Sequence, residues 1–125
     1  MKRRVPAHYS LAEARAALPE IQKALLQIHT LRRRLSKTAH RLESINSSHQ
    51  AAKDHKLLIA MMAESRDLLN GISDTGVLVR DLEAGLIDFP SKRNGKDIFL
   101  CYELGEEDID YWHGINEGKN GRKPV

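Results

Sequence analysis

Four side chains in the last third of the chain could carry out acid–base chemistry or bind a metal ion. They are Asp88, Cys101, Glu103 and His113. Carboxylates, thiolates and imidazoles are ligands that divalent transition metals accept. No two of these residues have a standard ligand spacing, so a divalent metal is an alternative and not the expectation.

Cys101 and His113 could also act as a nucleophile and its base. A free thiol titrates near pH ~8.5 and needs a cationic neighbour to become reactive. Asp88 and Glu103, which we expect beside Cys101, would raise its pKa instead. A cysteine is also among the residues most often buried. We therefore do not expect thiol catalysis, and we lean towards a protein that is not an enzyme.

The same third of the chain could bind a small anion or a peptide group. Lys92, Arg93 and Arg122 supply cations, and Trp112 or Tyr111 could stack on the ligand. The candidate ligand-binding residues are Asp88, Arg93, Cys101, Glu103, Glu106, Trp112, His113 and Arg122.

A β-hairpin should bring several of these residues together. The dipeptide Asn94-Gly95 is typical of a type I′ turn, because both turn positions need positive φ. With this turn at the tip, Asp88 lies opposite Cys101 and Leu86 opposite Glu103. The face that packs on the core then carries Ile87, Phe89, Ile98, Leu100 and Tyr102. A one-residue slip would separate Asp88 from Cys101.

Two further elements should flank the hairpin. Residues 77–79 predict a short first strand. After Gly105, the acidic residues 106–108 suit the first turn of a helix. We therefore predict a short helix over residues 106–113, which would present Trp112 and His113, followed by a loop-like arm.

The first half of the chain predicts two amphipathic helices. Ser10 and Glu13 form a capping box, and apolar residues recur at heptad spacing from about 11 to 46. Pro19 predicts a kink or a break in this first helix. The pattern stops at residues 46–48.

The second helix should run from about residue 51 or 54 to 69 or 72, forming an antiparallel hairpin with the first. The first helix would be ~54 Å long at ~1.5 Å per residue. That is long for a chain of 125 residues. We therefore expect a homodimer that forms through the helical region.

Basic residues gather in the first half, where residues 1–56 carry a net charge of +8 against −5 for residues 57–125. An RNA- or ribosome-associated protein would use the basic face Arg32, Arg33, Arg34, Lys37 and Arg41 to contact phosphates. No interleaved aromatic residues accompany this face. A solvated helix surface is the preferred interpretation.

Composition indicates one domain. The chain has 41% hydrophobic residues, enough for a modest core. No run approaches the ~18 apolar residues of a membrane span, and no apolar segment follows the basic start as in a secretory signal. The single cysteine suits a reducing compartment. We expect an α+β protein of the cytoplasm, with a helical hairpin over residues 10–74 and a β-meander, short helix and arm over residues 75–125.

Several segments resemble one small bacterial family. They are YSLAEARAALPEI, GVLVRDLEAGLIDFPS, LCYELGEEDIDYWH and GRKP. The family is catalogued as domain of unknown function 2203, and the resemblance covers nearly the whole chain. It implies no established activity, substrate or cofactor. Its recurring polar positions fall on Asp88, Cys101, Gly105, Glu106, Trp112, His113, Gly121 and Arg122, while Lys119-Asn120 departs from the family pattern.

The leading hypothesis is a cytoplasmic interaction protein that binds a small anion or a peptide group in its C-terminal region. A metal-dependent hydrolase, with Asp88, Glu103 and His113 as ligands, is one alternative. An RNA- or ribosome-associated protein that uses residues 32–41 is the other.

Overall fold

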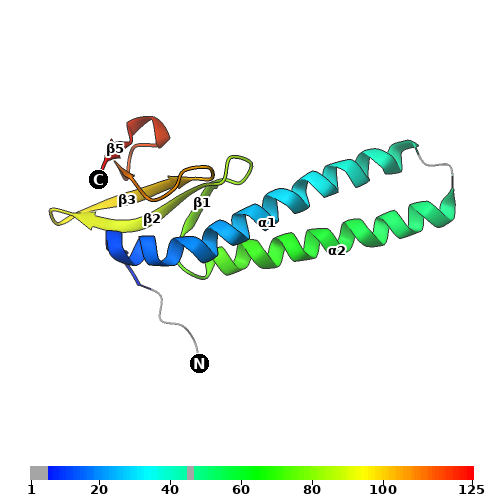
Figure 1. The fold of residues 1–125 in the computed structure, drawn as a ribbon, viewed down its shortest axis with the longest axis horizontal. Coiled ribbons are helices and arrows are strands. Elements are labelled where there is room, and N and C mark those ends of the chain that lie inside the picture. Colours follow the sequence, from blue (N-terminus) through cyan, green and yellow to red (C-terminus); the bar gives the residue numbers. More distant parts are fainter. Residues whose placement is uncertain (1–5, 45–46) are drawn as a thin grey trace, which may run out of the picture.

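The computed structural model of this chain describes residues 6–44 and 47–125. Two long helices form a hairpin, and a five-stranded antiparallel sheet lies against one end of it (Figure 1). The elements are α1 (Leu11–Ser44), α2 (Ser48–Ser73), β1 (Leu78–Asp81), β2 (Leu86–Arg93), β3 (Lys96–Glu103), β4 (Tyr111–Gly114), the 3-10 turn η1 (Lys119–Gly121) and β5 (Lys123–Pro124). The predicted α+β fold is confirmed. No helix in the described part of the chain is long and apolar enough to cross a membrane.

Helix α1 begins where the capping box predicts. The Ser10 N–H donates to Glu13 Oε1 at 2.9 Å, and the Glu13 N–H donates to Ser10 Oγ at 3.0 Å. The predicted break at Pro19 is wrong, because one helix continues through it. Its neighbours Leu18 and Ile21 are buried in the core, and their packing holds the helix across the missing donor. The predicted helix end at residue 46 lies outside the described residues.

Helix α2 begins earlier than predicted because Ser47 caps it, accepting a hydrogen bond from the Gln50 N–H. Near this end, Arg41 of α1 binds Asp54 of α2 through Nε at 2.8 Å and Nη2 at 2.6 Å. Asp54 is only 2% exposed. No sequence pattern predicted this pair, because it depends on how the two helices are aligned.

The hairpin register is confirmed at every predicted pair. Asp88 lies opposite Cys101, Leu86 opposite Glu103 and Arg93 opposite Lys96. At the tip, φ is 53° for Asn94 and 77° for Gly95, as a type I′ turn requires. Because the strands follow one another in the order β1-β2-β3-β4-β5, the sheet is a simple meander.

The predicted helix over residues 106–113 is wrong. Residues 111–114 form strand β4, which pairs with residues 98–101 of β3. Without β4, this side of β3 would have unpaired backbone groups next to the core. Strand geometry also buries His113 on one face while Trp112 packs towards the other. The only short helix in this part of the described chain is the 3-10 turn η1.

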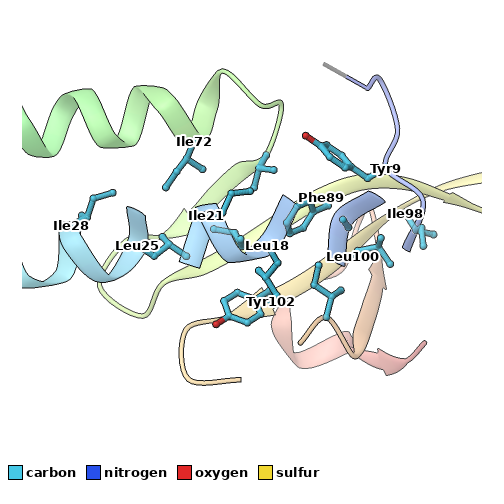
Figure 2. Packing of buried hydrophobic residues seen from close by; sticks show 14 residues of the cluster. Tyr9, Leu18, Ile21, Leu25, Ile28, Ile72, Phe89, Ile98, Leu100 and Tyr102 are labelled. Atoms are coloured by element: carbon cyan, nitrogen blue, oxygen red, sulfur yellow. The ribbon is translucent and has the colours of Figure 1, made fainter. Parts of the chain in front are cut away.

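The core lies between the sheet and α1 (Figure 2). Leu18, Ile21, Leu25 and Ile28 of α1 meet Ile87, Phe89, Leu100 and Tyr102 of the sheet, and Ile72 of α2 closes the cluster. Tyr9 packs edge-on against Phe89, with ring centroids 5.3 Å apart. This is the predicted core face. The chain after β4 lies beyond the opposite face (Figure 1), and there the polar residues gather.

Candidate functional site

Asp88, Cys101 and His113 meet on the sheet face that does not pack on the helices. They come from the adjacent strands β2, β3 and β4. A carboxylate oxygen of Asp88, Sγ of Cys101 and a ring nitrogen of His113 all lie within 4.8 Å of one another. None of the three residues is more than 3% exposed. We call these three residues the buried triad.

Two hydrogen bonds fix the ring of His113. Its Nδ1 lies 2.9 Å from the carbonyl oxygen of Gly114. A carbonyl only accepts, so Nδ1 carries a proton. Its Nε2 lies 2.8 Å from Asp88 Oδ1, and one proton between these two atoms completes the pair. The ring therefore always presents Nε2 to Asp88.

Asp88 is held from its other side by Arg80 of β1. The Arg80 Nε donates to Asp88 Oδ2 at 2.9 Å, and its guanidinium lies 4.9 Å from the centre of the Phe99 ring. A buried carboxylate is costly unless it is paired, and here each oxygen has a partner. Arg80 was missed by the sequence analysis. No signal in the sequence could have found it, because its place beside Asp88 depends on how β1 pairs with β2.

The thiol of Cys101 is not poised to react. Its pKa is raised to about 12, mainly by burial and secondly by the nearby carboxylate of Asp88. The nearby Arg122 favours the thiolate but does not offset these effects. At neutral pH the protein alone therefore keeps Cys101 protonated, which argues against a nucleophilic cysteine.

Glu103 and Glu106 lie beside the triad and are paired with cations. Glu103 forms an ion pair with Lys119. The two carboxylate oxygens of Glu106 lie 2.7 and 2.6 Å from Nη2 of Arg122. That guanidinium also stacks 4.1 Å from the centre of the Tyr111 ring. Two of the predicted ligand-binding residues, Glu106 and Arg122, therefore bind each other.

Trp112 and Arg93 lie on the helix-facing side of the sheet. Trp112 pairs with Leu100 and packs against the core cluster. The Arg93 guanidinium and the Lys123 ammonium each lie 4.8 Å from the centre of a Trp112 ring. The structure thus separates Trp112 from His113, although the two are adjacent in sequence.

A cleft of about 330 Å³ reaches the triad and is lined in part by Asp88 and His113. Arg80 and Leu86 form another part of its wall, and residues 115–119, which follow β4, contribute the rest. Clefts of about 480 and 500 Å³ are lined by other parts of the described chain, around residues 8–13 and around Trp112. Only the smallest of these three clefts touches the triad.

The model of one protein family matches residues 8–125, and its description is uncharacterized conserved protein (DUF2203). The chain belongs to the DUF2203 family. The resemblance seen in the sequence is thereby confirmed. No curated protein and no solved structure matches the chain. The DUF2203 description carries no activity, so the function has to be argued from the side chains.

The basic face of this DUF2203 chain lies on the part of α1 that extends away from the sheet (Figure 1). Arg32, Arg33, Arg34 and Lys37 are exposed. Arg41 differs from them, because Asp54 binds its guanidinium. The face is therefore distant from the triad and its cleft.

Proposed function

We propose that this DUF2203 protein is a non-enzymatic protein of the bacterial cytoplasm that binds a small anion, in the cleft over Asp88 and His113. The observation that supports the proposal most is that a solvent-accessible cleft ends on buried polar groups of fixed orientation. Ligand sites typically combine such a concave surface with a few well-placed polar groups.

The cleft wall supplies donors suited to a carboxylate or a phosphate. Arg80 contacts Asp88 through Nε, and 44% of its side chain is exposed, so its terminal nitrogens can donate to a ligand. Lys119 is 47% exposed. Among the described residues that line the cleft, Glu117 carries an exposed carboxylate. It is bound by Lys123 and by the Gly114 N–H, which lowers its pKa and reduces its repulsion of an anion.

The test is an NMR titration of the full chain with inorganic phosphate and with acetate at constant ionic strength. We expect saturable shifts at the amides of residues 114–119 and of Arg80 and Asp88. Removing the Lys119 cation with Lys119→Gln should weaken binding about 10- to 150-fold, because a charge-assisted hydrogen bond contributes about 1.5–3 kcal/mol.

Lys53→Gln is the matched control, because Lys53 is an exposed lysine of α2 remote from the cleft. It should leave binding unchanged. Shifts no larger than those caused by chloride, or an equal loss in both variants, would refute the proposal.

The metal-dependent hydrolase is a second candidate, and the clustering of three donor types is the observation that favours it. Its expected ligand Glu103 is paired with Lys119, so the hydrolase would use Cys101 in its place. Metal-stimulated turnover of p-nitrophenyl phosphate or of p-nitrophenyl acetate that is lost in Asp88→Asn would support the hydrolase. No turnover above buffer with zinc, cobalt or manganese would exclude it for these ester classes.

We also propose that two copies associate through the helical hairpin. Ile59 and Met62 lie one turn apart on α2 and are 67% and 60% exposed, and such apolar surface favours association. Sedimentation should show a dimer that Ile59→Glu converts to a monomer, while Lys56→Glu on the same helix does not. A monomeric wild-type protein at high micromolar concentration would reject the dimer.

The RNA alternative keeps the support of the exposed cations Arg32, Arg33, Arg34 and Lys37. Phosphate contacts through them predict binding to mixed RNA that weakens steeply with salt. Binding that is absent, or independent of salt, would eliminate this alternative.

A further inference from the structure

We infer that the buried triad binds one thiophilic divalent cation, with Asp88, Cys101 and His113 as its three protein ligands. The inference deepens the proposed function, because the ion would lie at the floor of the same cleft and the anion would reach it there. The first support is the donor set. Oxygen, sulfur and nitrogen donors from three adjacent strands converge within 4.8 Å, and such a mixed set suits zinc or cobalt better than magnesium or calcium.

The second support is the orientation of His113. Metal-binding histidines nearly always donate their other ring N–H to a carbonyl or a carboxylate. Here the Nδ1–H donates to the Gly114 carbonyl at 2.9 Å. Nε2 is thereby the ligand atom, and it already points towards Asp88.

The third support is the position of Arg80. It binds Asp88 Oδ2 at 2.9 Å and leaves Oδ1 to the triad. A ligating carboxylate is typically held by a partner of this kind on its second oxygen. Two of the three donors, on Asp88 and His113, are therefore aimed by contacts from outside the triad.

The proton and charge balance is also favourable. Binding removes the thiol proton of Cys101 and the proton between Nε2 and Oδ1, and both protons pass to solvent. One dication replaces two protons, so the net charge of the buried site does not change. Burial of uncompensated charge, the main cost of such a site, is thereby avoided.

Three protein ligands leave one position of a tetrahedral ion open. Asp88 and His113 line the cleft, so water or an anion can occupy that position. With Arg80 beside it, this position would attract a carboxylate or phosphate oxygen. The metal ion would therefore form part of the anion site.

The test uses the full chain, treated with a chelator and then titrated with Co²⁺. We expect one ion per chain, a sulfur-to-cobalt charge-transfer band in the near-ultraviolet, intense visible bands of a tetrahedral ion, and displacement by Zn²⁺. A wild-type protein that shows no charge-transfer band and no stoichiometric binding overturns the inference, whatever any variant does.

Three variants assign the ligands. Cys101→Ser should lose the charge-transfer band while its circular dichroism stays native. Arg80→Gln should keep the band but bind cobalt about 10- to 100-fold more weakly, as loss of an orienting partner does. Glu64→Gln is the control, because Glu64 is an exposed carboxylate of α2 that lies away from the sheet, and its affinity should equal that of wild type. If Cys101→Ser does not fold, His113→Gln takes its place. An unchanged cobalt spectrum in Cys101→Ser or His113→Gln would refute the ligand assignment.

The same samples separate the two proposals. If chelator-treated protein binds phosphate in the cleft but never binds cobalt, the metal inference fails and the proposed function stands. If cobalt binds but phosphate changes neither the amide shifts nor the visible bands, the proposed function fails and the metal site stands.

Discussion

Gly85 allows a sharp test of the geometry that positions the triad. It lies just before β2, and its carbonyl accepts a hydrogen bond from the Leu104 N–H at 3.0 Å. The next pair of the ladder joins Leu86 to Glu103, and the ladder then continues to Asp88 and Cys101. A change at Gly85 therefore acts on the open end of the hairpin that carries Asp88 and Cys101.

Alanine at Gly85 meets two obstacles. The backbone has φ of +68°, a conformation that costs an L-residue about 1–2 kcal/mol. The new Cβ would also lie 2.5 Å from Cβ of Leu104. That atom is fixed to the backbone and cannot rotate away, so the strands must shift, at about 1–3 kcal/mol for an overpacked site. Together we expect a loss of about 2–5 kcal/mol in the free energy of unfolding.

Urea unfolding, followed by circular dichroism, measures this loss. With a slope of about 2 kcal/mol per molar urea, the midpoint of Gly85→Ala should fall by about 1–2.5 M. Two glycines of the same chain serve as matched controls. Gly95 has φ of +77° and open space around it, so alanine there should cost only the conformational term of about 1–2 kcal/mol. Gly71 lies within α2 and also has open space, so alanine there should stabilise by about 0.5–1 kcal/mol.

The order of the unfolding free energies of the three variants tests whether Leu104 crowds Gly85. If Gly85→Ala costs no more than Gly95→Ala, then Leu104 does not crowd Gly85 and this account of the strand end is wrong. If Gly71→Ala destabilises as much as Gly85→Ala, the variants report a general intolerance of alanine and not the contact.

Three further predictions follow from the described contacts. The pKa of Cys101 is raised to about 12 in the folded protein, so the unfolded chain loses the thiol proton at a lower pH than the folded protein does. The free energy of unfolding should therefore fall as pH rises from about 9 towards 12, and this fall should be smaller in Cys101→Ala. An equal fall in both proteins contradicts the buried neutral thiol. Hydrogen bonds from Arg41 hold the pKa of Asp54 below its usual value, so stability should fall as pH drops through that lowered pKa. Asp54→Asn should lower the melting temperature at neutral pH, whereas Asp67→Asn, at a 72% exposed side chain, should not; equal effects would reject the buried pair. Tyr9→Phe removes the hydroxyl that donates to a backbone carbonyl at 2.5 Å and should cost about 1 kcal/mol in urea unfolding; no loss would mean that this bond does not stabilise the fold.

Local signals in the sequence predicted much of this fold. The capping box at Ser10 and the type I′ turn at Asn94-Gly95 depend on a few neighbouring residues, and both form as expected. The turn then fixes the register, so the pairing of Asp88 with Cys101 followed by counting residues. The core face of the hairpin followed from the alternation of side chains in a strand.

The wrong predictions arose where distant parts of the chain outweigh local preference. Acidic residues before Ile109 favour a helix start, but β3 needed a partner along its other edge, and residues 111–114 became β4. Pro19 disfavours a helix locally, yet burial of Leu18 and Ile21 holds α1 together. A distant contact also explains the residue that departs from the family pattern, Lys119, because it pairs with Glu103 at the rim of the cleft.

The sequence by itself determined that Asp88 faces Cys101, because one turn sets the register of a single hairpin. Tertiary structure decided the rest of the candidate site. Only the pairing of β4 with β3 places His113 beside Asp88, and only the pairing of β1 with β2 supplies Arg80. These contacts join residues 25 and 8 positions apart, and they depend on the order of strands in the sheet, which no short segment encodes.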